Sequence, residues 1–99
     1  MIEDYDNRTF QKTGDIVARK IVDETILVPV QGELASMRRV FSLTPVADFI
    51  WNSIDGTSTV KEIRADVVRS FQVDEETAKT DISELIEQLI EYRLIGEAQ

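Results

Sequence analysis

Residues 43–51, Leu-Thr-Pro-Val-Ala-Asp-Phe-Ile-Trp, mark the point at which the chain changes from a strand pattern to a helix pattern. Thr44 is a residue type that caps helix N-termini, and Pro45 suits the first helical position, where a helix leaves the N–H unbonded. The apolar residues that follow recur three and four positions apart, which is the period of an amphipathic helix. A helix is therefore predicted over residues 45–54, with Gly56 just beyond its end.

Upstream of this helix, β-branched residues gather in short runs. Residues 16–22 and 25–30 are two such runs, and the polar pair Asp23-Glu24 separates them at the length of a two-residue hairpin turn. Residues 38–43, Arg-Arg-Val-Phe-Ser-Leu, read as a third strand that leads into the helix. An antiparallel meander of three strands is predicted, and we expect one of its edges to be open.

Downstream, the sequence predicts two further helices. Thr59 and Glu62 have the spacing of a capping box, and the apolar stripe that follows them reaches Phe71. Asp74 is the start signal for a third helix over residues 75–92. Its apolar positions span roughly 140° of the helix surface at ~100° per residue, which is wider than a helix needs to cover a core. They are Ala78, Ile82, Leu85, Ile86, Leu89 and Ile90.

These elements predict an α+β fold in which three strands precede three helices (βββααα). A chain of 99 residues has room for one core. Residues 1–14 mix charges with scattered apolar residues and are expected to form a flexible or loosely packed arm, so that residues 15–99 make up a single domain. An open strand edge beside a helix with spare apolar surface forms a groove that suits an extended peptide.

Composition excludes several classes of function. The chain has no cysteine and no histidine, which removes thiolate and imidazole catalysis, disulfides and zinc sites built on these ligands. With 11 basic against 19 acidic residues, its formal charge of -8 opposes binding to nucleic acid and to anionic membranes. The sequence shows neither a run approaching the ~20 apolar residues of a membrane span nor a signal peptide, so we expect a cytoplasmic protein.

Candidate catalytic and metal-ligating groups are limited to carboxylates. Those on the third predicted helix complement its apolar stripe and are interpreted as a solvated face. The sequence holds neither a glycine-rich phosphate loop nor the spacing of an EF-hand. We therefore expect no catalytic residue, no metal ligand and no cofactor.

Several short patterns, in this order, resemble the family of the pyrroloquinoline quinone biosynthesis protein D. They are Val17-Ala18-Arg19-Lys20 with Asp23-Glu24 and Ile26-Leu27-Val28, Leu43-Thr44 with Ala47 and Ile50-Trp51, Asp55-Gly56 with Thr59-Val60 and Glu62-Ile63, and Asp81-Ile82 with Leu89 and Leu94-Ile95. The resemblance covers residues 15–95. Arg93 departs from the family, whose members frequently carry a glycine before the final Leu-Ile.

The resemblance implies a winged-helix-like domain that is a peptide chaperone and adaptor rather than an enzyme. Members of the family recognise ribosomally synthesised precursor peptides (RiPPs), in pyrroloquinoline quinone biosynthesis or a related pathway. The leader of the precursor pairs with the third strand, lies against the third helix and is presented to a radical S-adenosylmethionine (SAM) enzyme. Carried onto this sequence, the peptide-binding residues are Arg38, Arg39, Val40, Phe41, Ser42 and Leu43 on the strand, and Ile82, Leu85, Ile86 and Leu89 on the helix.

Two other functions are compatible with the same pattern of elements. A winged-helix DNA-binding regulator has this order of strands and helices, but residues 74–92 carry seven acidic residues and only Lys79 as a base, which does not suit a groove lined by phosphates. Alternatively, the chain is a structural module whose open strand edge is closed by homodimerisation.

Overall fold

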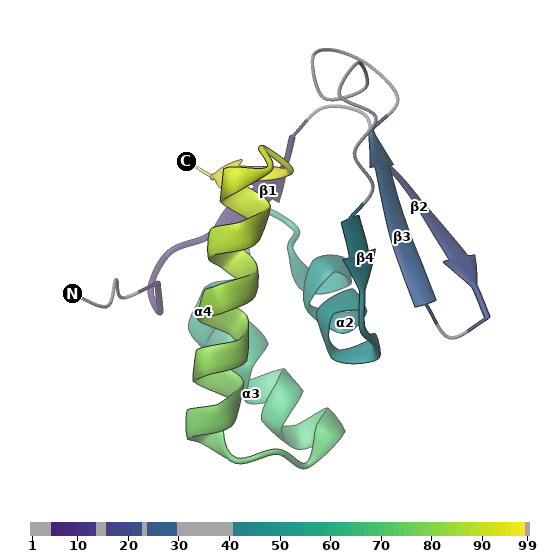
Figure 1. Ribbon diagram of the computed structural model, residues 1–99. Helices are drawn as coiled ribbons and strands as arrows, with labels where there is room; N and C mark the ends of the chain where they lie inside the picture. Colours follow the sequence, from purple (N-terminus) through teal and green to yellow (C-terminus); the bar gives the residue numbers. More distant parts are fainter. Residues whose placement is uncertain (1–4, 14–15, 23, 30–40, 99) are drawn as a thin grey trace.

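The structure is a computed structural model that describes residues 5–13, 16–22, 24–29 and 41–98 (Figure 1). It has an α+β fold with three helices. In chain order the elements are β1 (Phe10–Lys12), β2 (Ile16–Ile21), β3 (Glu24–Pro29), β4 (Phe41–Leu43), α2 (Pro45–Ser53), α3 (Val60–Phe71), α4 (Glu75–Glu91) and β5 (Ile95–Glu97).

The strands form two antiparallel sheets. The three-stranded sheet has the order β2-β3-β4, as the sequence predicts, and runs directly into the helices. A second, two-stranded sheet pairs β1 with β5 and was not predicted. The order βββααα is therefore incomplete, because a short strand precedes it and another follows it. Each of these strands has three residues, too few to show an alternating pattern in the sequence.

The beginning of the chain differs from the loosely packed arm that the sequence suggests. Tyr5 and Phe10 are 5% and 3% exposed, and their rings meet edge to face at 5.9 Å. Backbone hydrogen bonds also tie this segment to the loop before α3, with the Gly56 N–H donating to the Phe10 carbonyl at 2.8 Å. Residues 5–12 thus contribute to the core, through partners that lie far away in the sequence.

Each helix begins at the capping residue that the sequence indicates. Thr44, Thr59 and Asp74 all have extended backbone angles, and each side-chain oxygen accepts a hydrogen bond from a backbone N–H of the first turn. At α3 the capping box is complete, because the Glu62 carboxylate also accepts from the Thr59 N–H at 2.8 Å. These caps fix where the helices start after β4 and after each loop.

The end of α4 uses a left-handed residue. Arg93 has a φ of 59°, and the next residue, Leu94, donates its N–H to the Leu89 carbonyl at 2.8 Å. This hydrogen bond closes the last turn in the manner of a Schellman motif, in which glycine is the usual left-handed residue. Arg93 therefore takes a conformation that glycine usually has at a helix end, and it turns the chain toward β5.

The core lies between the three helices and one face of the sheet β2-β3-β4. Leu27 of β3 and Leu43 of β4 are 0% and 1% exposed on that face and belong to one hydrophobic cluster with side chains of all three helices. Trp51 of α2, at 3%, belongs to the same cluster. In the part of the chain that the structure describes, none of the helices is both long and apolar enough to cross a bilayer.

A buried charge fastens the beginning of the chain to the helices. Arg64 of α3 has 8% of its side chain exposed and pairs with both carboxylate oxygens of Asp6. Its Nε also lies 3.4 Å from Oε1 of Glu75 at the start of α4. The hydrogen bond from Arg64 lowers the pKa of Asp6 below its usual value of 3.8, against the opposing effect of burial.

Replacing Asp6 with asparagine is expected to lower the free energy of unfolding at pH 7 by about 1–2 kcal/mol, because the buried guanidinium loses a charged partner. Since the pKa of Asp6 is lower in the folded than in the unfolded chain, its contribution is complete above pH 3.8 and is lost as the pH falls through the folded value. The difference between wild type and Asp6→Asn, measured by urea denaturation, should therefore shrink between pH 7 and pH 2. A constant difference would mean that Asp6 acts through packing rather than charge.

Candidate functional site

Strand β4 forms one edge of the three-stranded sheet. Its residues pair with β3 in the register Thr25↔Leu43, Ile26↔Ser42 and Leu27↔Phe41. Among the described residues, no backbone hydrogen bond joins β4 to a segment other than β3. Within the described ranges, the opposite side of β4 is therefore an unpaired edge.

Ser42 is the residue of β4 that directs its backbone toward this edge. Ile21 and Glu24 are paired across the two-residue turn between β2 and β3, and residues that flank such a turn exchange backbone hydrogen bonds. In an antiparallel sheet, the backbone N–H and carbonyl groups of successive residues point to opposite sides of the strand. Those of Thr25 and Leu27 therefore point toward β4, and those of their partners on β4 point toward β3. The N–H and the carbonyl of Ser42 are left to point outward.

Two cavities lie between this edge and α4. The larger, of about 380 Å³, is lined from α4 by Asp81, Glu84, Leu85 and Gln88, and from β4 and α2 by Phe41, Ser42, Thr44, Val46, Ala47 and Ile50. The smaller, of about 320 Å³, is lined by Phe41, Ser42, Gln88, Glu91 and Tyr92. Because they share residues of both elements, we treat them as one groove, the β4–α4 groove.

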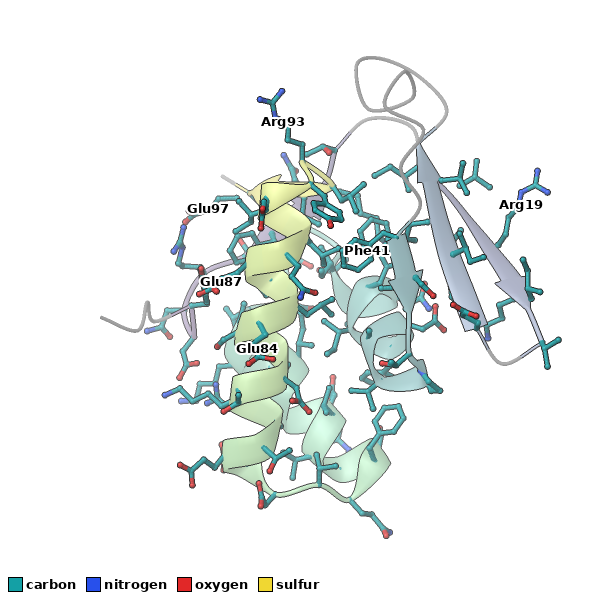
Figure 2. The ribbon with its side chains drawn as sticks, in the orientation of Figure 1. Arg19, Phe41, Glu84, Glu87, Arg93 and Glu97 are labelled. Atoms are coloured by element: carbon teal, nitrogen blue, oxygen red, sulfur yellow. The ribbon has the colours of Figure 1, made fainter. Side chains whose placement is uncertain are left out.

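Aromatic and aliphatic side chains form the apolar part of the groove. Phe41 is half-buried, lines both cavities and meets the ring of Tyr92 edge to face, with centroids 5.2 Å apart. Figure 2 labels Phe41 in the space between β4 and α4. Leu85 adds an aliphatic surface from α4. Tyr92 follows the last residue of α4 and lines only the smaller cavity, so its ring stands at one end of the groove, whereas Phe41 lies where the two cavities meet.

Carboxylates form the polar wall. Asp81, Glu84 and Glu91 are exposed on α4, and Figure 2 shows Glu84 projecting from the helix. None of the three takes part in an ion pair with another described residue. Ser42 stands on the other side, where its hydroxyl donates to the Glu24 carboxylate. The groove therefore combines a free strand edge, an apolar floor and an acidic wall.

Only some of the residues that the sequence assigns to peptide binding line the groove. Phe41, Ser42 and Leu43 form β4, and the first two line the groove. Arg38, Arg39 and Val40 lie outside the described residues. On α4, Leu85 is 7% exposed and belongs to the core, but it also lines the groove, whereas the side chains of the other three are covered entirely by the protein's own core. These are Ile82, Ile86 and Leu89, at 1%, 0% and 0% exposure.

Sequence reasoning missed five residues that line the groove from α4 and its end, namely Asp81, Glu84, Gln88, Glu91 and Tyr92. It concentrated on the apolar stripe, whose centre is core, whereas the groove meets the polar border of that stripe. A signal was present in the sequence. Asp81, Glu84, Gln88 and Glu91 recur at intervals of three and four residues, which places them in one row along the helix.

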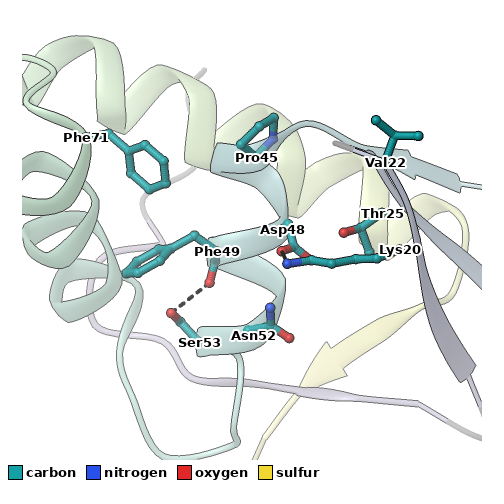
Figure 3. A pocket seen from close by; sticks show the side chains of 9 residues that line it. All are labelled: Lys20, Val22, Thr25, Pro45, Asp48, Phe49, Asn52, Ser53 and Phe71. Atoms are coloured by element: carbon teal, nitrogen blue, oxygen red, sulfur yellow. Dashed lines mark hydrogen bonds and ion pairs between the residues drawn. The ribbon is translucent and has the colours of Figure 1, made fainter.

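A second hollow, of about 670 Å³, lies between the β2–β3 hairpin and α2 (Figure 3). Its apolar wall includes the rings of Phe49 and Phe71, which meet edge to face at 5.5 Å. The Lys20 ammonium lies 3.8 Å from the Asp48 carboxylate across it. Among the described elements, none of the helices runs beside the outer edge of β2, and five of the six residues of β2 are exposed. This hollow shares no lining residue with the β4–α4 groove.

The carboxylates whose pKa is lowered in this part of the chain stabilise local structure. Hydrogen bonds from the backbone N–H groups of Ser58 and Thr57, and from their hydroxyls, lower the pKa of Asp55 to about 2 and hold the loop before α3. The bond to Thr77 lowers the pKa of Asp74 at the start of α4. Within the described ranges, acidic side chains form no group of three or more that could hold a metal ion.

Comparisons with known proteins agree with this arrangement of elements. Residues 24–95, which are more than half of the chain, match the family model described as Coenzyme PQQ synthesis protein D (PqqD). No curated protein sequence matches the chain. A solved structure, described as TbiB1 in complex with the TbiA(beta) leader peptide, has a similar fold, with a TM-score of 0.69. It is 21% identical in sequence, and the similarity covers 86% of this chain and 93% of that one.

Proposed function

The chain belongs to the family of coenzyme PQQ synthesis protein D, and from this premise we propose that it binds the leader of a ribosomally synthesised precursor peptide in the β4–α4 groove. The leader adds to the sheet as a further strand beside β4. It is then held for a modifying enzyme that acts on the rest of the precursor. In this proposal the protein is an adaptor, and the chemistry belongs to its partner.

The observation that carries the proposal is the unpaired edge of β4 beside α4. Strand addition needs backbone donors and acceptors that face outward, and Ser42 supplies one of each. It also needs pockets for alternate side chains of the peptide, and two cavities, both lined by Phe41, are available for these. A similarly folded protein, TbiB1, has been solved with a leader peptide bound, which supports the same use of the fold here.

We propose a radical SAM enzyme as the partner, in pyrroloquinoline quinone biosynthesis or a related pathway. The support is the family to which the chain belongs. The partner is expected to bind the leader complex more tightly than the free protein. Size-exclusion chromatography of the protein with the enzyme encoded beside it, with and without leader, tests this step.

Backbone amide chemical shifts on addition of the leader encoded beside the protein will test the binding site. The largest changes are expected at Phe41, Ser42 and Leu43 and along the groove side of α4, at Gln88 and Glu91. A scrambled leader of the same composition is the control. Changes confined to the β2–β3 hairpin and α3 would contradict the proposed groove.

Light scattering of the free protein shows whether a second copy already occupies the edge of β4, as a homodimerisation module would require.

A further inference from the structure

We infer that the β4–α4 groove selects leaders with two basic side chains, four residues apart, on the face that turns toward α4, with an apolar residue midway between them. The inference rests on the proposed function and adds the class of peptide that the groove accepts. It follows from the charges that line the groove and from the spacing of the helix and of an added strand.

The wall that α4 gives to the groove carries charge of one sign. Its ionisable residues are Asp81, Glu84 and Glu91, and among the described lining residues of the two cavities there is no lysine or arginine. These carboxylates have no ion-pair partner among the described residues, so an incoming cation does not have to displace a basic side chain of the described part of the chain. A leader with acidic residues facing α4 would place like charges together.

The spacing of these carboxylates fits a strand. Asp81 and Glu84 form one acidic position, and Glu91 forms the other, about 13 Å further along the axis at ~1.5 Å per residue. In a strand, alternate residues face the same side, and two residues four positions apart are also separated by about 13 Å. Both acidic positions can therefore be reached by one peptide strand that pairs with β4.

The residue midway between the two cations turns toward the middle of the groove. Phe41 lines both cavities there, and Leu85 lies on the α4 side. These are apolar surfaces, so an aliphatic or aromatic peptide side chain is favoured at this position. The resulting pattern is basic, any residue, apolar, any residue, basic, in which the two intervening residues face away from α4.

Helix α4 also provides a matched control. Glu87 is exposed on the same helix as Glu84 but lines neither cavity, and Figure 2 labels both residues. Glu84→Lys and Glu87→Lys change the net charge of the protein by the same amount. They differ in whether the new charge stands in the groove.

The test is selection of a displayed library of random twelve-residue peptides on wild type, Glu84→Lys and Glu87→Lys, each checked for folding by circular dichroism. On wild type and Glu87→Lys, we expect enrichment of lysine or arginine at two positions four apart. On Glu84→Lys, the preference at one of these positions should turn to aspartate or glutamate. Exchanging both basic residues of a selected peptide for glutamate should lower its affinity for wild type about tenfold at low salt and only about twofold at 0.5 M salt.

The outcomes separate this inference from the proposed function. Selected peptides that shift the amides of β4 and α4 but show no basic preference would overturn the inference alone. The same would follow if Glu84→Lys and Glu87→Lys selected identical peptides. Peptides that shift amides elsewhere, or a library that yields no binders, would overturn the proposed groove and the inference together.

Discussion

Ser42→Pro is expected to weaken leader binding at least about tenfold while leaving the domain folded. Proline lacks the backbone N–H that would donate a hydrogen bond to a carbonyl of the leader strand. Its ring also occupies the edge along which that strand would lie. Because the backbone of Ser42 points away from β3, the substitution removes no hydrogen bond of the β3–β4 ladder. Fluorescence polarisation of a labelled leader measures the loss of affinity.

Ser42→Ala is the matched control for this experiment. It removes the hydroxyl that donates to Glu24 but keeps the backbone N–H. We expect its affinity for the leader to stay within about twofold of wild type, since the hydroxyl bond is exposed and contributes little. If the proline and alanine variants bind equally well while both are folded, the leader does not pair with β4 and strand addition is wrong.

The largest effect on stability is expected from Leu89→Ala. Leu89 is 0% exposed in the core between α4 and its neighbours, and truncating a fully buried leucine costs about 3–4 kcal/mol in the free energy of unfolding. For a domain of this size, that loss corresponds to a fall in Tm of about 15 °C or more. Thermal denaturation followed by circular dichroism provides the measurement.

Leu85→Ala is the informative comparison, because Leu85 lies on the same helix but lines the groove. We expect Leu85→Ala to lower leader affinity about fivefold through lost apolar contact. Leu89→Ala should leave affinity unchanged when it is measured below its own Tm. A loss of affinity in folded Leu89→Ala that matches that of Leu85→Ala would mean that the leader reaches deeper into the helix layer than the groove does.

The parts of the fold that sequence predicts well are those decided by neighbouring residues. Thr44-Pro45, the Thr59–Glu62 box and Asp74 act within one helical turn, and all three helices begin where these residues indicate. The hairpin of β2 and β3 is also local. By contrast, β1 and β5 join opposite ends of the chain, and neither strand is long enough to carry a pattern that reveals its partner.

Of the residues that line the groove, sequence reasoning indicated Phe41 and Ser42 of β4 and, on α4, Leu85. The strand could be inferred because it leads straight into a helix, which leaves no room for another strand along the chain. The other residues on the helix side of the groove could not be inferred from the sequence. An apolar stripe shows which residues are buried and not what buries them. Ile82, Ile86 and Leu89 are buried by the protein itself, and the residues that remain accessible, Gln88 and Glu91, stand at the polar border of the stripe.

The pairing of β1 with β5 determines how the domain would open under a pulling force. Phe10 faces Glu97 and Lys12 faces Ile95, so the outer ends of both strands lie at the same end of the pair. A pulling force applied through the two ends of the chain would open this pair like a zipper, one hydrogen-bonded step after another. It would not have to shear all of its bonds at once. Since β1 leads on to β2 and β5 follows the turn at Tyr92, tension that has opened this pair would reach both the sheet that carries β4 and the end of the groove at Tyr92.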